Sequence, residues 1–251
     1  MKITIITQAR FGSSRLPGKV LMKIRDLTLL GIHLKRLKKV NVDYSIIVAT
    51  TNEIESDEII SVAQNEGCLY FRGSMDDVLD RYYHASLMTS STHIVRVTSD
   101  CPLIDPILVS NVIQHTVDND YSYCMTSEKF PDGVDVEVFK TEELKEAFLN
   151  AKLPSEREHV TPYIRNKSKL NRTYGEFKCN EGDFEIVRMT VDEKSDFNTV
   201  KILIENLGVE MLWFDYANYI ISNPNLFENQ QIIRNSGYFK SLKNDAKTKN
   251  Q

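Results

Sequence analysis

Groups that can bind phosphate are concentrated in one segment near the start of the sequence, residues 8–19 (QARFGSSRLPGK). This segment holds three cationic side chains, two serine hydroxyls and the backbone N–H groups beside a glycine. Groups of these kinds hold a triphosphate and neutralise a departing pyrophosphate. The candidate binding residues are Ala9, Arg10, Gly12, Ser13, Ser14, Arg15 and Lys19. We expect a polyphosphate site here, with a charged surface turn as the alternative.

The spacing of the segment excludes the best-known phosphate loops. Gly12 and Gly18 are separated by five residues, one more than in a Walker A loop. Val20 follows Lys19, where a Walker A loop has a Ser or Thr that binds magnesium. The segment also lacks the G-x-G-x-x-G pattern of dinucleotide-binding loops. Kinase, ATPase and dehydrogenase interpretations therefore lose most of their support.

Short apolar runs and helical patterns alternate through the first half of the chain. The runs predict strands at 2–7, 45–50, 68–71, 93–98 and 121–125. The patterns between them predict helices at 27–37, 55–66, 76–88 and 105–117. This alternation predicts an α/β, three-layer fold with a mostly parallel sheet and helices on both faces. Ligands bind outside the carboxyl ends of strands in such a sheet, which is where the 8–19 segment lies.

The rhythm changes after Met125. Residues 134–139 (VDVEVF) alternate as in a half-exposed strand, which indicates a small inserted or edge element with antiparallel pairing. We predict further helices at 141–151, 156–166, 195–206 and 213–222, and a return strand at 187–191.

We divide the chain into one main domain and a C-terminal extension. The predicted domain spans 1–225 and holds an insertion or dimerisation element at about 126–180. The extension is 226–251, and its Lys- and Asn-rich end is expected to be frayed from about 240.

The net charge of −4 conceals an asymmetry along the 251 residues. Residues 1–40 hold ten Lys or Arg against one acidic residue, Asp26, so they carry about +9 and the rest about −13. This distribution disfavours a nucleic-acid partner and favours a local anion site. With no apolar run long enough for a membrane span or signal peptide, we expect a cytoplasmic protein without a membrane partner. Four scattered cysteines without a CxxC argue against a zinc site or disulfide framework.

Five strings carry a resemblance to a known superfamily. ARFGSSRLPGK resembles the N-terminal signature of the acid-sugar cytidylyltransferases, the group of CMP-3-deoxy-manno-octulosonate (KDO) synthetase and CMP-sialate synthetase. GSMDDVLDRYYHA, RVTSDCPLIDP, PDGVDVEVF and REHVTPYI resemble the SpsF-type spore coat polysaccharide biosynthesis proteins of that superfamily. The resemblance runs from Met1 to about Asn206. It implies a Rossmann-like nucleotidyltransferase fold of the nucleotide-diphospho-sugar transferase type. The implied reaction is attack of a sugar hydroxyl on the α-phosphate of CTP, which releases pyrophosphate and a CMP-sugar.

The same resemblance assigns roles to the acidic strand ends. Asp100 and Asp192 match the superfamily's metal-binding aspartates, and each follows a predicted strand. Magnesium prefers carboxylate oxygens, so Mg²⁺ is the expected cofactor. Lys19, Arg10 and Arg15 would steady the triphosphate, and with Asp100 they form the expected catalytic set. A helix N-cap is the alternative role for a strand-end aspartate.

The nucleotide base is expected near the end of the second strand. Candidates there are Thr50 and Thr51, with Arg72 and Ser99 nearby in the inferred topology. The related synthetases usually have an Asp where Thr51 stands, so this sequence departs from them at the base site and UTP stays an alternative to CTP. Strand propensity alone also accounts for the two threonines.

The acceptor sugar is expected to contact a set of charged side chains: Asp80, Arg81, Asp135, Glu137, Arg157 and His159. Asp135 and Glu137 are two apart on a predicted strand and so share a side, where they could bind sugar hydroxyls or a second metal. A solvated edge strand is the alternative. Arg157 and His159 could pair with an acidic group of the acceptor.

Two other functions stay open at this point. One is a GT-A-type glycosyltransferase, although the place of its Asp-x-Asp motif reads Ser99-Asp100-Cys101. The other is a nucleotide-binding protein without turnover. The resemblance also implies a homodimer, with its interface in 134–163.

Overall fold

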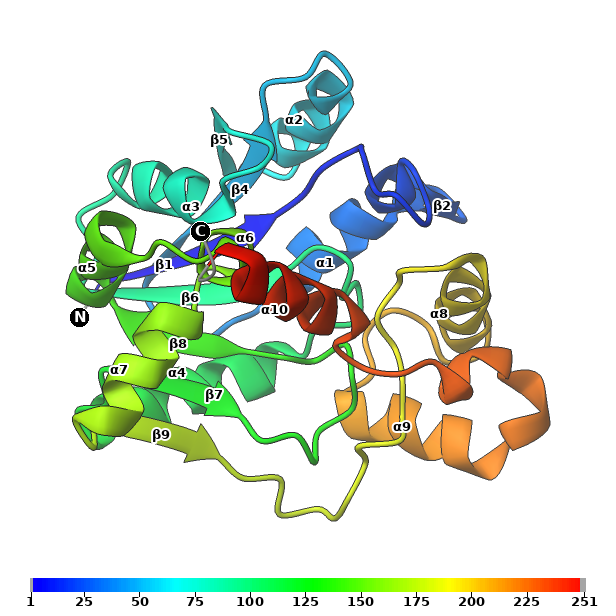
Figure 1. Cartoon of the computed structure of the whole chain (residues 1–251). Helices are drawn as coiled ribbons and strands as arrows, with labels where there is room; N and C mark the ends of the chain where they lie inside the picture. The colour runs from blue at the N-terminus through cyan, green and yellow to red at the C-terminus, as the bar shows by residue number, and fades with distance from the viewer. Residues whose placement is uncertain (1, 249–251) are drawn as a thin grey trace.

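The computed structural model describes residues 2–248, and within them one mixed sheet forms the centre of the fold (Figure 1). The seven strands lie in the order β5 (Leu69–Gly73), β4 (Tyr44–Thr51), β1 (Ile3–Gln8), β6 (His93–Thr98), β8 (Glu137–Lys140), β7 (Tyr123–Thr126), β9 (Tyr174–Phe177). All adjacent pairs are parallel except the two that involve β8. A small antiparallel hairpin, β2 (Lys23–Ile24) and β3 (Leu27–Thr28), stands apart. The predicted α/β fold with a mostly parallel sheet is confirmed.

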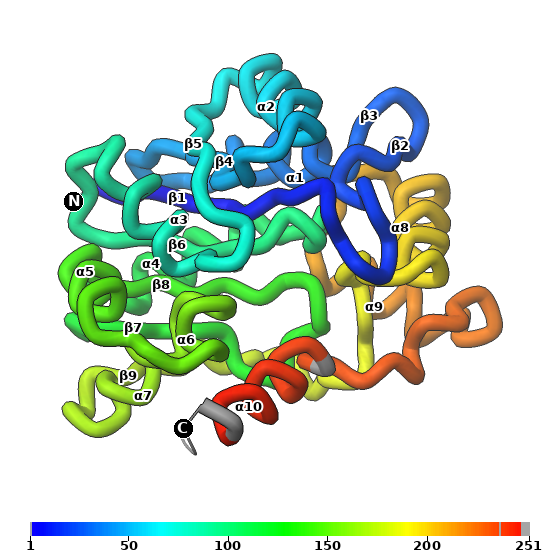
Figure 2. Tube along the Cα trace, turned by 45° about the horizontal axis from the view of Figure 1, so that its top comes forward, coloured from blue at the N-terminus to red at the C-terminus, as the bar shows by residue number. Residues whose placement is uncertain are grey.

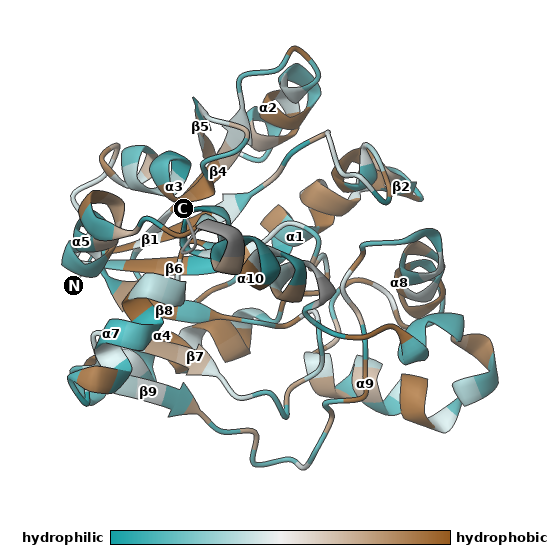
Figure 3. Cartoon of the chain, in the orientation of Figure 1, coloured by the Kyte–Doolittle hydropathy of each residue, from teal (hydrophilic) through white to brown (hydrophobic). Residues whose placement is uncertain are grey.

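Alternate residues of the strands face two separate apolar cores. In β1, Ile3 and Ile5 belong to one core and Ile6 to the other, because successive side chains of a strand point to opposite faces. The first core is covered by α1 (Leu29–Leu37), α2 (Ser56–Asn65), α4 (Pro106–Asp118), α8 (Lys194–Leu207) and α9 (Trp213–Ser222). The second is covered by α3 (Val78–Ser86), α5 (Thr141–Asn150) and α7 (Pro162–Leu170). Hydrophobic and hydrophilic residues alternate along these helices (Figure 3), as expected for elements with one buried face.

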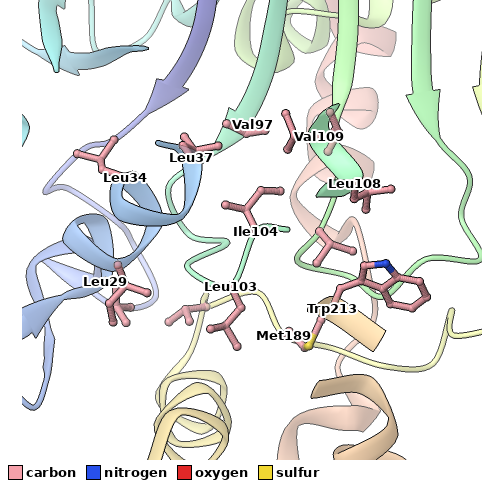
Figure 4. Packing of buried hydrophobic residues seen from close by; sticks show 14 of the residues in the cluster. Leu29, Leu34, Leu37, Val97, Leu103, Ile104, Leu108, Val109, Met189 and Trp213 are labelled. Carbon is pink, nitrogen blue, oxygen red and sulfur yellow. The ribbon is translucent and has the colours of Figure 1, made fainter. Parts of the chain in front are cut away.

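The loop after β6 is held by the first core. Leu103 and Ile104 are fully buried and pack among side chains of α1, α4 and α9 (Figure 4). His33 of α1 supports the same loop, since its Nδ1 lies 2.9 Å from the Cys101 carbonyl oxygen and its Nε2 lies 3.0 Å from Thr7 Oγ1. Burial lowers the pKa of His33 to about 4, against the opposing effect of the Cys101 carbonyl. Neutral His33 thus joins the end of β1 to the loop that carries Asp100.

Two predicted strands differ from the structure. Residues 187–191 form no strand, and only Arg188 makes a bridge, to Asp132. The N–H groups of Met189 and Thr190 both donate to the Asp132 carbonyl, so this buried segment is tied to a loop. The strand expected at 134–139 occupies only Glu137–Lys140. It is a central strand with buried valines on either side of Glu137. The prediction of a half-exposed edge strand was therefore wrong.

The C-terminal half of the chain holds the other differences. The helix expected at 156–166 is two helices, α6 (Pro154–His159) and α7, because Val160 adopts a φ of 69° and Pro162 starts the next helix. The frayed tail expected from about 240 was wrong for 240–248: α10 (Ser236–Thr248) packs on α6 (Figure 2). The rest of that tail lies outside the described residues. The division at 225 stays a prediction.

Three short 3-10 helices complete the described elements: η1 (Lys19–Leu21), η2 (Pro224–Leu226) and η3 (Glu228–Gln231). Of the helices between residues 2 and 248, none is long and apolar enough to cross a membrane.

Gly133 tests the packing of the 187–191 segment. Its φ is 117°, and a Cβ there would lie 2.5 Å from Thr190 N and 2.6 Å from Met189 C. Both neighbours are backbone atoms and cannot turn away. Gly133→Ala should therefore lower the free energy of unfolding by about 3 kcal/mol, measured by urea denaturation. Gly237→Ala is the control, because a Cβ there meets nothing within 4 Å; similar losses for both variants would contradict the prediction.

His33 should make stability depend on pH. Its native pKa of about 4 lies below the unfolded value of about 6.5, so its stabilising contribution is complete above about pH 6.5 and lost as pH falls through about 4. The contribution is about 3 kcal/mol. Between about pH 7 and pH 4, the wild type should lose that much more unfolding free energy than His33→Gln. His84→Gln, at a side chain 41% exposed, is the control and should lose as much unfolding free energy as the wild type. Equal losses in the wild type and His33→Gln would refute the assignment.

Candidate active site

A cavity of about 710 Å³ opens where β1 and β6 end, a usual size for a small-molecule site. Its lining includes Gln8 and Ala9 at the end of β1 and Thr98 at the end of β6. The 8–19 segment forms one end of the cavity, and residues of α6, α7 and the start of α10 form the other. The site therefore lies at the predicted edge of the sheet.

The 8–19 segment is shaped by a turn that closes on Phe11. The Phe11 carbonyl accepts hydrogen bonds from Ser13 N and Gly18 N, both at 2.8 Å. Gly18 has a φ of 69°, a left-handed conformation that favours glycine, and it starts η1 with Lys19. Of the expected binding residues, Ala9, Arg10, Ser13, Ser14, Arg15 and Lys19 line the cavity. Gly12 is exposed and is absent from the lining.

Lys19 lies between two carboxylates. Its Nζ is 3.0 Å from Asp100 Oδ2 and 2.9 Å from Asp192 Oδ1, and it also donates to the Val191 carbonyl at 2.7 Å. Burial alone would lower the pKa of Lys19, but the two carboxylates outweigh burial and raise that pKa. The structure thus brings together residues 19, 100 and 192, as the sequence predicted.

The two aspartates differ in their surroundings. Burial would raise the pKa of Asp100, but the charge of Lys19 outweighs it and the pKa falls to about 2. Asp192 Oδ2 forms an ion pair with Arg15 at 2.9 Å and accepts a hydrogen bond from Arg188 at 3.2 Å. Asp100 is therefore held in its charged form, and Asp192 is surrounded by cations.

The donor set is compatible with a divalent cation. Oxygens of Asp100 and Asp192 both lie within 3.0 Å of one cationic atom, Lys19 Nζ, so they already converge on a positive charge. Among residues 2–248 no group of three His, Cys, Asp or Glu could hold a metal. Magnesium in nucleotide sites is bound by one or two carboxylates together with phosphates and water. Two aspartates therefore suffice if phosphates supply further ligands.

Arg188 fixes the position of Asp192, a role that no sequence pattern indicated. It is buried, its Nε donates to Asp196 at 2.9 Å, and its Nη1 donates to Asp132 at 2.6 Å. Asp196 in turn accepts the N–H groups of Asp192 and Glu193, each at 2.9 Å. Asp132 was not predicted because its partner lies 56 residues away. The network explains why residues 187–192 hold their position without strand pairing.

Besides Gly12, five expected ligands lie outside the cavity lining: Thr50, Thr51, Arg72, Ser99 and Asp80. Thr50 and Thr51 are buried and hydrogen-bond Ser56, while Arg72 pairs with Asp57. The other two are engaged as well: Ser99 Oγ lies 2.8 Å from Thr7 Oγ1, and Asp80 lies 3.3 Å from His84. The assignment of these five to ligand binding stays a prediction, and in this structure their side chains support the ends of strands and the start of α3.

The remaining acceptor candidates all line the cavity, but most are already paired. Glu137 is buried and accepts hydrogen bonds from Arg96, Tyr123 and Thr161. Burial would raise the pKa of Glu137, but Arg96 outweighs burial and lowers it. Glu137 is thus a structural centre, and it does not form a free acidic pair with Asp135.

Asp135 and the candidates of the neighbouring helices are engaged elsewhere. Asp135 pairs with Arg234, and Arg157 pairs with Asp77 and donates to the Phe148 carbonyl. His159 Nε2 lies 3.0 Å from Ser241 Oγ of α10. Arg81 is buried and donates to the Ser74 carbonyl. Other cavity residues were missed in the sequence, chiefly Arg96, Arg165 and Tyr238. Arg96 and Arg165 belong to patterns typical of an ordinary strand and helix, and Tyr238 lies in the C-terminal extension, where no helix was predicted.

Comparisons with known proteins identify the family of this chain. The cytidylyltransferase family matches residues 4–231. An uncharacterized protein of Methanocaldococcus jannaschii is 41% identical over 78% of this chain and 81% of its own length. The spore coat polysaccharide biosynthesis protein SpsF of Bacillus subtilis is 33% identical over 82% of this chain and 88% of its own.

Solved structures agree in fold. A cytidylyltransferase from Leptospira borgpetersenii has a TM-score of 0.86 and 34% identity, and the match covers 93% of this chain and all (100%) of that one. A CMP:2-keto-3-deoxy-manno-octonic acid synthetase complexed with CTP has a TM-score of 0.62 and 17% identity over 82% of this chain and 99% of its own, a likeness of fold. With the family match across most of its length, the chain belongs to the cytidylyltransferase family of nucleotidyltransferases.

Proposed function

We propose that this enzyme transfers CMP from CTP to a hydroxyl of an acidic sugar and releases pyrophosphate, with magnesium as cofactor. The observation that carries the proposal is the convergence of Lys19, Asp100 and Asp192 beside the 8–19 segment. The acceptor oxygen forms a bond to the α-phosphorus of CTP while the bond to the α,β-bridging oxygen breaks. Pyrophosphate leaves with the electron pair of that bond, and the hydroxyl proton passes to solvent.

The 8–19 segment would hold the triphosphate. Ser13, Ser14 and Arg10 line the cavity, and no carboxylate in the described chain lies within 4.0 Å of the Arg10 guanidinium. Arg15 and Lys19 are paired with Asp192, and phosphate oxygens would share these cations on binding. Positive charge next to the departing pyrophosphate stabilises the developing negative charge in the transition state.

Asp100 and Asp192 would hold the magnesium ion. Bound there, it would neutralise phosphate charge on both sides of the bond that breaks. The low pKa of Asp100 keeps that carboxylate charged at any physiological pH. Arg188 and Asp196 keep Asp192 oriented through the contacts described above.

Support for CTP and for an acidic acceptor comes from relatives. A 3-deoxy-manno-octulosonate cytidylyltransferase of Lawsonia intracellularis is 28% identical over 45% of this chain and 45% of its own length. Three of the candidates for contacts with the acceptor, Arg81, Arg157 and His159, line the cavity. The homodimer with an interface in 134–163 also stays a proposal.

A glycosyltransferase is less well supported. Its only plain Asp-x-Asp candidate is Asp118-Asn119-Asp120, which ends α4. Asp120 has a φ of 51° and pairs with Lys140, and none of the three residues lines the cavity. The second alternative, a nucleotide-binding protein without turnover, would bind CTP and leave it intact in the assay that follows.

The decisive experiment supplies CTP, UTP, ATP or GTP with magnesium and a panel of sugar acids and sugar phosphates. Pyrophosphate release and the mass of the product are both recorded. We expect pyrophosphate and a CMP-sugar with CTP. Intact CTP with every acceptor would contradict the proposal. In a parallel assay that supplies a sugar nucleotide as donor, release of a free nucleoside diphosphate would indicate the glycosyltransferase instead.

Substitutions at the convergence point should remove turnover while leaving the fold intact. Asp100→Asn and Lys19→Met should each lower kcat/KM by at least about 100-fold, because charge stabilisation in the transition state is lost. Urea denaturation monitors the fold. The matched controls are Asp118→Asn and Lys23→Met, whose side chains are exposed and outside the cavity. Undiminished turnover in Asp100→Asn, or unfolding of both site variants, would count against the assignment.

A further inference from the structure

The cavity has a wall that lies outside the residues matched by the family. That match ends at residue 231, yet Ile233, Arg234, Asn235, Gly237 and Tyr238 all line the cavity. These five residues form the start of α10 and the turn before it, and we name residues 233–238 the C-terminal wall. The wall lies beside α6, and residues of α6 and α7 line the same cavity.

The C-terminal wall is anchored at several points. Asp245 of α10 is buried and accepts from Ser155 N at 2.9 Å and from Ser155 Oγ at 2.6 Å. The Tyr238 ring meets His159 edge-on, with 5.1 Å between ring centroids. Arg234 donates to the Phe130 carbonyl at 3.1 Å. α10 therefore holds a defined position on α6, as Figure 2 shows.

The charges of the cavity single out one arginine at this end. Nine Lys or Arg and eight Asp or Glu line the cavity, so most of its cations have a carboxylate partner. Within residues 2–248, three of the nine have no carboxylate within 4.0 Å, and these are Arg10, Arg81 and Arg165. Arg10 belongs to the 8–19 segment, and Arg81 is buried against the Ser74 carbonyl. Arg165 is the one at the α7 end.

Arg165 is held by an uncharged partner from the C-terminal wall. Its Nη2 donates to the Tyr238 hydroxyl at 3.2 Å, and its guanidinium lies 5.6 Å from the centre of the Tyr238 ring. The neighbouring Arg96, Arg157 and Arg234 are each neutralised, by Glu137, Asp77 and Asp135. A guanidinium that is positioned but not neutralised keeps its charge for an anion, and its planar donors match a carboxylate.

We infer that Arg165 binds the acidic group of the acceptor sugar, and that the C-terminal wall sets acceptor choice by positioning Arg165 through Tyr238. The inference rests on the proposed transfer of CMP to an acidic sugar. Arg165 replaces Arg157 as the expected ligand of the acceptor's acidic group, because Arg157 already forms an ion pair with Asp77. Arg165 is a binding residue in this view, and Tyr238 is a positioning residue.

The test compares acids with their neutral methyl esters. The acceptors are 3-deoxy-manno-octulosonate, N-acetylneuraminate, galacturonate and their methyl esters, with CTP and magnesium, read by pyrophosphate release. Arg165→Met should lower kcat/KM for the acid that the wild type uses best by about 30-fold, mainly through KM, and for its ester by less than about threefold. Tyr238→Phe should raise KM for that acid about fivefold, and Arg165→Lys should retain part of the acid preference.

Matched controls separate binding from folding. Lys169→Met removes an exposed charge on the same helix, and Tyr70→Phe removes a hydroxyl outside the cavity. Both should leave KM and kcat unchanged. The Kd for CTP, measured by calorimetry with calcium in place of magnesium, should stay within about twofold in every variant.

Failure of the proposed function can be distinguished from failure of the inference about Arg165. If the wild type binds CTP but releases no pyrophosphate with any acceptor, the proposed function fails and the inference fails with it. If the wild type turns over acids but Arg165→Met loses acid and ester activity equally, or weakens CTP binding as much as acceptor binding, only the inference is overturned. If Tyr238→Phe leaves KM for the acid unchanged, the inference that the C-terminal wall sets acceptor choice is overturned.

Discussion

One electrostatic arrangement organises the molecule: the Lys19 ammonium held between the carboxylates of Asp100 and Asp192. These residues come from three distant parts of the chain, and each is fixed by different structure. Lys19 is set by the left-handed Gly18, Asp100 by a loop that His33 and the apolar core support, and Asp192 by Arg188 and Asp196. A buried cation between two acids is unfavourable unless all three are positioned, so the surrounding hydrogen bonds are part of the site.

Much of the fold could be predicted because its signals are local. Strand 93–98 and helix 213–222 are where their periodicity placed them, and the strand-end position of Asp100 followed from the parallel pattern. The errors arise where non-local contacts decide. Residues 187–191 have the alternation of a strand, but their N–H groups bond to loop carbonyls, and Val160 interrupts a helical pattern that continues in the sequence. Pairing partners cannot be seen in one segment alone.

The site was predictable to a similar extent. The 8–19 segment carries its chemistry in its own sequence, so most of its residues line the cavity. Thr50 and Thr51 were placed correctly at a strand end, but their hydroxyls hydrogen-bond Ser56. The residue types alone do not show whether such a hydroxyl contacts a ligand or a neighbouring side chain. Arg165 was missed because a cation on an amphipathic helix usually faces solvent. Its significance emerges only when the partners of every other arginine in the cavity are known.

The reversed direction of β8 has a consequence for how this edge of the sheet is built. The residues that follow parallel strands all lie at the same edge of the sheet. For a strand that runs the other way, the residues at that edge are those that precede the strand. Glu137 pairs in register with Arg96, near the end of β6, so the residues just before β8 arrive at the same opening. That explains why Asp132, Asp135 and Val136 border the cavity. The first part of the PDGVDVEVF string therefore borders the cavity, and its last three residues lie in strand β8.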